Sequence, residues 1–99
     1  MQLSDKQIKV LAIVAGKNED GSLVDLDQII ERQDYKTNKS AIQFIIRNLV
    51  QEKKLIEKKG SENRRGRRRV LFDVTPLGEK YAKWTAPKVH HSLKEVLVE

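Results

Sequence analysis

Basic side chains crowd into one short stretch of this sequence. Between residues 53 and 69 nine lysines and arginines stand against two acidic residues, a net charge of +7, while the whole 99-residue chain carries +6. Clustered cations of this kind attract polyanions, because each phosphate that they neutralise releases counterions. We expect the polyanion to be double-stranded DNA.

Five of the last six positions in this stretch are arginines: Arg64, Arg65, Arg67, Arg68 and Arg69. No acidic residue follows Glu62 within the stretch, so nothing nearby in sequence neutralises them. We expect them to contact phosphates or a minor groove. The alternative is a basic loop that only promotes solubility.

A helix directly before the basic stretch completes the candidate surface. Thr37 or Asn38 is predicted to cap it, and it runs to about Glu52. Apolar residues at three- and four-residue spacing predict one buried face: Ile42, Ile45, Ile46 and Leu49. The opposite face is polar apart from Phe44 and is free to make contacts, although a solvated helix face has the same pattern.

The chain before this helix is predicted to hold two supporting helices. Ser4 and Gln7 have the spacing of a capping box, and the apolar run behind them predicts a first helix that ends near Gly16. A brief strand at residues 23–24 precedes Asp25, which is predicted to cap a short second helix. The second helix and the long one, joined by a tight connection, form a helix-turn-helix pattern.

After the long helix the chain is predicted to fold back as a β-hairpin. A first strand opens at residues 55–56, a polar loop at 60–66 turns the chain, and a second strand covers 70–74. Residues 75–76 combine a threonine cap with a proline in the first helical turn, which predicts a fourth helix that reaches about Trp84.

Residues 85–99 are predicted to form a separate helical segment. Pro87 restarts the helix, and apolar residues then fall on one side: Val89, Leu93, Val96 and Leu97. Such a stripe needs a partner. It either folds back on the first helix or meets its copy in a second subunit. We favour a homodimer, because dimerisation adds affinity and sets the spacing of half-sites.

Three stretches resemble the winged helix-turn-helix transcription regulators, most nearly their MarR-like and PadR-like groups. NLVQEKKLIEK at residues 48–58 resembles the junction of recognition helix and wing, and RRGRRR resembles a wing tip. FDVTPLGEKY at residues 72–81 resembles the end of the wing and the T-P-x-G start of the next helix. The resemblance implies a mainly α fold with a small β-hairpin, in which residues 1–84 form the winged domain.

The resemblance also implies how DNA is bound. Helix 38–52 enters the major groove, and the basic wing at residues 57–70 lies on the backbone or in the minor groove. The DNA contacts that it implies in and before the helix are Lys36, Thr37, Asn38, Lys39, Ser40, Gln43, Phe44 and Arg47.

Individual roles follow from side-chain chemistry. The guanidinium of Arg47 reads guanine and the amide of Gln43 reads adenine, while Lys39 and Ser40 meet phosphates. Phe44 either touches a thymine methyl group or stacks in a groove, or it is covered by the wing or by Tyr35.

One position departs from the family pattern. Lys54 stands where the family commonly has glycine as a left-handed helix stop. A lysine in that conformation costs about 1 kcal/mol. We therefore expect the helix to end differently or to run slightly longer, which changes the angle of the wing.

Other functional classes lack their signatures. There is no cysteine, no nucleophile motif and no glycine-rich phosphate loop, so we expect neither an enzyme nor a cofactor. The adjacent His90 and His91 cannot share a helix face, so no metal site is expected. The longest apolar run, at residues 10–15, is too short for a membrane span, so we expect a cytoplasmic protein. Binding to DNA would place it with the nucleoid. No small-molecule effector is evident from the sequence.

Two alternatives to a transcription regulator remain open. The first is a replication or plasmid-partition adaptor of the same fold, which would coat an array of repeats rather than protect one site. The second is a winged-helix module for protein or RNA, in which Phe44 and the C-terminal stripe bind a partner.

Overall fold

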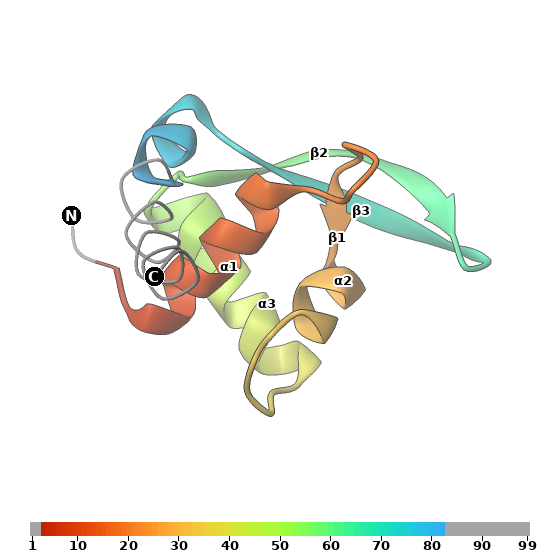
Figure 1. Ribbon diagram of the computed structural model, residues 1–99, viewed down its shortest axis with the longest axis horizontal. Helices are drawn as coiled ribbons and strands as arrows, with labels where there is room; N and C mark the ends of the chain where they lie inside the picture. Colours follow the sequence, from red (N-terminus) through yellow and green to blue (C-terminus); the bar gives the residue numbers. More distant parts are fainter. Residues whose placement is uncertain (1–2, 83–99) are drawn as a thin grey trace, which may run out of the picture.

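The computed structural model describes residues 3–82 of the chain. Three helices, three strands and the start of a fourth helix follow one another (Figure 1): α1 (Asp5–Gly16), β1 (Val24–Asp25), α2 (Leu26–Glu31), α3 (Lys39–Arg47) with a π-helical turn η1 (Asn48–Glu52), β2 (Ile56–Arg64), β3 (Arg67–Val74) and a helix at 76–82. The strands form one antiparallel sheet in the order β1-β3-β2. In Figure 1 helices α1 to α3 lie on one side of this sheet, and the β2–β3 hairpin extends beyond them.

Side-chain caps start helices α1, α2 and α3 as the sequence predicts. Ser4 and Gln7 form a reciprocal capping box at α1, and Asp25 forms another with Gln28 at α2. Asn38 caps α3, because its side chain accepts a hydrogen bond from the backbone of Ala41 at 2.9 Å. Each cap satisfies a backbone N–H that has no partner inside its helix.

One hydrophobic core lies between the helices and the sheet. Its buried members come from every element of the described chain before the fourth helix: Val10, Leu11, Val14, Val24, Ile29, Ile42, Ile46, Leu49, Leu55, Ile56 and Phe72. The predicted buried face of α3 is confirmed at Ile42, Ile46 and Leu49, while Ile45 is partly buried at its edge. This packing fixes the angle between α3 and the hairpin.

The hairpin is longer than the sequence suggests. The prediction of a loop at residues 60–66 is wrong, because β2 and β3 stay paired as far as Arg64 and Arg67. Only Arg65 and Gly66 form the turn, both at positive φ (52° and 76°), as a type I′ hairpin turn requires. A β-bulge between residues 58 and 61 accommodates Gly60 at φ 95°. The outer part of the hairpin is polar on both faces, so it lacks the alternation that marks a half-buried strand.

The end of α3 also differs from prediction. The helix is α-helical only to Arg47 and then widens into η1. Lys54 adopts the left-handed conformation at φ 56°, so the lysine takes the place of the family's glycine instead of moving the helix end. The backbone N–H of Leu55 then bonds the carbonyl of Leu49 at 2.9 Å, and the chain enters β2.

Lys54→Gly should therefore stabilise the protein. Glycine reaches positive φ without a steric penalty, so we expect the free energy of unfolding to rise by about 1 kcal/mol in urea denaturation. Lys53→Gly is the matched control, because Lys53 has a negative φ of −91° and glycine there only adds freedom to the unfolded chain. A stabilisation of equal size in both variants would contradict the strain at Lys54.

The start of the fourth helix is bonded to the end of α3. The Thr75 hydroxyl accepts a hydrogen bond from Gly78 N at 3.0 Å and donates one to the Lys54 carbonyl at 2.7 Å. The Thr75 N–H donates to the Leu55 carbonyl at 3.0 Å. The predicted threonine cap is thus confirmed. The predictions for Trp84, Pro87 and the apolar stripe of residues 85–99 lie outside the described residues.

Candidate nucleic-acid interface

A groove of about 390 Å³ separates α3 from the hairpin. Five of its lining residues are apolar: Leu26, Ile46, Val50, Val70 and Phe72. Five are basic: Lys39 and Arg47 from α3, Lys58 from β2, and Arg68 and Arg69 from β3. Asp25 is the one acidic residue in the lining, and it pairs with Arg64. Arg47 and the arginine-rich hairpin therefore face the same side of the protein and can meet one ligand.

The predicted contacts from α3 fall into two groups. Gln43 and Arg47 line the groove together with Lys39, and all three side chains are exposed. Asn38 is exposed, but its side-chain oxygen already accepts the capping hydrogen bond from the backbone N–H of Ala41. Phe44 is 69% exposed, so the alternative in which the hairpin or Tyr35 covers it is wrong for this chain alone.

The remaining predicted contacts lie at the start of α3. Lys36 and Ser40 are exposed, whereas Thr37 is half-buried. In the part of the chain that the structure describes, neither Lys39 nor Arg47 makes an ion pair, so both cations are available to an anionic ligand.

Comparison with solved structures identifies the architecture. A MarR family regulator from Neisseria meningitidis superposes with a TM-score of 0.73 at 22% sequence identity, over 97% of this chain and 61% of that one. The fold is a winged helix-turn-helix. No protein-family model and no curated protein matches the sequence. The helix-turn-helix is α2 and α3, and the β2–β3 hairpin is the wing.

The five arginines of the wing have unequal surroundings. Arg67 and Arg68 are exposed, and neither has a carboxylate partner among residues 3–82. Arg65 pairs with Glu31 at 3.0 Å and stays on the surface. Arg69 pairs with Asp27 at 2.8 Å and is largely covered. The wing thus offers two unpaired arginines rather than the five that its sequence suggests.

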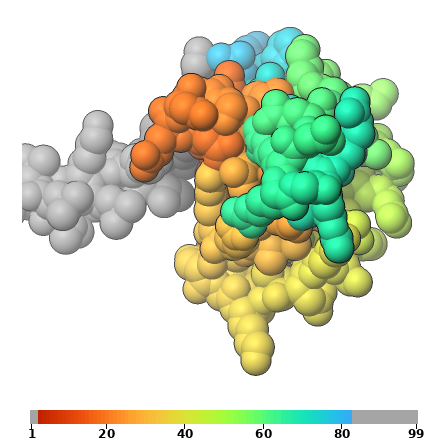
Figure 2. Space-filling model, turned by 90° about the vertical axis from the view of Figure 1, so that its right-hand side faces the viewer, coloured from red at the N-terminus to blue at the C-terminus, as the bar shows by residue number. Residues whose placement is uncertain are grey.

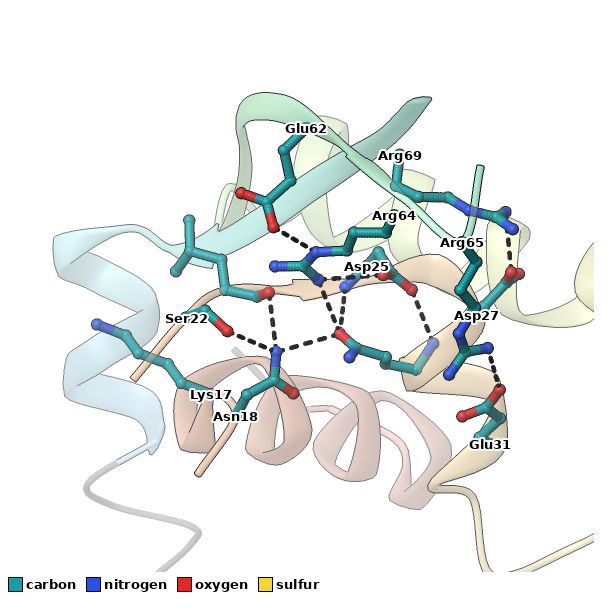
Figure 3. Close-up of polar contacts among 12 residues, drawn as sticks. Lys17, Asn18, Ser22, Asp25, Asp27, Glu31, Glu62, Arg64, Arg65 and Arg69 are labelled. Atoms are coloured by element: carbon teal, nitrogen blue, oxygen red, sulfur yellow. Dashed lines mark hydrogen bonds and ion pairs between the residues drawn. The ribbon is translucent and has the colours of Figure 1, made fainter. Parts of the chain in front are cut away.

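Arg64 points into the protein (Figure 3). Its guanidinium lies 3.1 Å from Asp25 Oδ2 and 3.0 Å from Gln28 Oε1, and its Nε bonds Glu62. Burial lowers the pKa of Arg64, but the hydrogen bonds to Glu62 and Asp25 outweigh it, and the pKa is raised above its ordinary value. Arg64 is therefore held charged against Asp25, Gln28 and Glu62, with its side chain only 15% exposed, and it is not free to meet a ligand.

The sequence does not reveal the carboxylates that pair with the wing arginines. Asp25, Asp27 and Glu31 all lie at or on α2, and each pairs with a wing arginine. Figure 2 looks toward the wing tip and shows α2 directly beneath the wing. The local pattern around Asp25 predicts only a helix cap, because its partner Arg64 lies 39 residues further along the chain.

Two other kinds of site receive no support in the described range. Residues 3–82 contain no group of three His, Cys, Asp or Glu side chains placed to hold a metal ion. None of the helices there has the length and apolar character needed to cross a bilayer.

Proposed function

We propose that this protein binds double-stranded DNA and regulates transcription. The observation that carries the proposal is the groove in which Lys39, Gln43 and Arg47 of α3 face Lys58 and Arg68 of the wing. A helix with hydrogen-bonding side chains beside a basic ribbon matches a major groove and its flanking phosphates. The regulator from Neisseria meningitidis shares this fold, which is consistent with the proposal.

In this mechanism the two elements have different tasks. The α3 helix enters the major groove, where Arg47 donates to guanine, Gln43 reads adenine and the exposed ring of Phe44 meets a thymine methyl group. Arg67 and Arg68 bind phosphates or the minor groove without regard to sequence. Affinity then comes mainly from the wing and discrimination from α3.

The proposal includes a homodimer on a near-palindromic site. It rests on the apolar stripe predicted for residues 85–99 and on the benefit of two half-sites to a domain this small. The spacing between half-sites in selected DNA reports the number of subunits directly.

Selection of bound duplexes from a random pool is the first test, using the full chain. Fluorescence anisotropy at near-physiological salt then compares the selected duplex with random duplex, single-stranded DNA and structured RNA. We expect the selected duplex to bind best. Equal or tighter binding to RNA would overturn the proposal and favour the protein or RNA module, and protection of a long repeat array would favour the adaptor.

Arginine substitutions test the division of labour. Replacing both Arg67 and Arg68 with alanine should weaken binding to all duplexes and reduce the salt slope by about 2, because two phosphate contacts are lost. Arg47→Ala should cost about 1–3 kcal/mol on the selected duplex and little on random duplex. Titrations over a range of salt concentrations measure both quantities. Equal losses on both duplexes in the two variants would contradict separate roles.

A further inference from the structure

The outer half of the wing lacks support from the third strand of the sheet. Strand β1 pairs with β3 only at Val24–Phe72 and Asp25–Leu71. Residues 67–70 therefore pair with β2 but not with β1. Because a two-stranded ribbon is marginally stable by itself, the outer wing needs side-chain contacts to hold one position.

Helix α2 supplies these contacts where β1 ends. Asp27 lies in the first turn of α2, directly after β1, and its Oδ2 lies 2.8 Å from Arg69 Nη1. Asp25 reaches across to Arg64 at 3.1 Å. Both pairs are partly shielded from solvent: the side chains of Asp27 and Arg69 are 31% and 22% exposed, and those of Asp25 and Arg64 are 6% and 15% exposed.

A third pair on the same helix differs in its exposure. Glu31 and Arg65 lie 3.0 Å apart, but their side chains are 55% and 61% exposed. Exposed pairs contribute little, because water screens the attraction and ordering two long side chains costs entropy. The shielded pairs at the start of α2 are therefore the effective anchors (Figure 3).

We propose that Asp25 and Asp27 are positioning residues for DNA binding. They hold Arg64 and Arg69 against α2, and so keep Arg67 and Arg68 at a fixed distance from the recognition helix α3. Of the five wing arginines, two anchor the wing, two meet the ligand, and Arg65 makes the exposed pair with Glu31. This inference rests on the proposed function, but the anchoring itself is measurable without DNA.

The direction in which Asp27→Asn changes DNA affinity shows whether Asp27 positions the wing or acts only through its negative charge. Asp27→Asn removes a negative charge near the groove, so electrostatics alone would strengthen DNA binding. If Asp27 positions the wing, affinity falls instead, because the competent wing position is less populated. A fall of that population to about a third weakens binding about threefold. Asp27 is a better test than Asp25, which is buried and caps α2.

Two matched variants complete the experiment. Glu31→Gln makes the same kind of change on the same helix at the exposed pair, and it should leave affinity unchanged or raise it. Asp27→Glu keeps a carboxylate and should retain binding close to that of the unmodified protein. Fluorescence anisotropy with the selected duplex measures all three, and circular dichroism confirms that each is folded.

Amide hydrogen exchange gives the second readout, without DNA. Exchange at residues 61–70 should accelerate in Asp27→Asn and stay unchanged in Glu31→Gln. Unaltered exchange in Asp27→Asn, or unaltered or tighter DNA binding, would overturn the inference. Should the unmodified chain bind no duplex, the proposed function fails, and the exchange result still decides whether α2 anchors the wing.

Discussion

Gly78→Ala should lower the free energy of unfolding by about 3 kcal/mol, at the upper end for an overpacked site. A Cβ atom at this position would lie 1.9 Å from the carbonyl oxygen of Leu55 and 2.8 Å from its carbonyl carbon. Both are backbone atoms, so no side chain can move aside. Instead the fourth helix must separate from the end of α3, with loss of the Thr75 hydrogen bonds that join them.

Urea denaturation followed by circular dichroism measures this loss. Gly16→Ala is the matched control, because a Cβ atom there has no neighbour within 4 Å and alanine favours a helix. It should be neutral or stabilising by up to about 1 kcal/mol. A Gly78→Ala protein as stable as the control would show that the close approach at Leu55 is not required.

Arg64→Met should lower the free energy of unfolding by about 2–3 kcal/mol. Methionine keeps most of the apolar stem but leaves the Asp25 carboxylate, whose side chain is 6% exposed, without its cation. Breaking a fully buried pair costs about 3–5 kcal/mol, and the partial exposure of Arg64 at 15% reduces this. Thermal and urea denaturation both report the loss.

Arg65→Met is the control for this prediction. Its pair with Glu31 is exposed, so its removal should change stability by no more than about 0.5 kcal/mol. If the two variants were equally stable, Arg64 would have no structural role. It would then return to the residues expected to contact DNA.

Local patterns predicted the helices well. The caps at Ser4, Asp25 and Asn38 and the apolar face of α3 each depend on residues within one or two helical turns, so they are visible in the sequence. The T-P-x-G step was also recognisable. Its physical reason came only from the structure, because the Gly78 contact lies in a distant part of the chain.

The wing was predicted less well, for two reasons. Its outer strands are polar on both faces, so no periodicity distinguishes them from a loop. The roles of its arginines depend on carboxylates that the fold brings together from distant positions, as with Arg64 and Asp25. Net charge along the sequence therefore overestimates the charge available to a ligand.

Because a two-residue turn at Arg65 and Gly66 joins β2 to β3, the wing can change length only by adding or removing residues in both strands. Adding one residue to each strand would move the turn outward by about 3.3 Å, close to the rise of one base pair along a duplex. The same addition would turn the side chains at the tip to the opposite face, and a second addition would restore them. The outer wing can therefore lengthen only in steps of two residues per strand, about 6.6 Å, if its side chains are to keep the same faces.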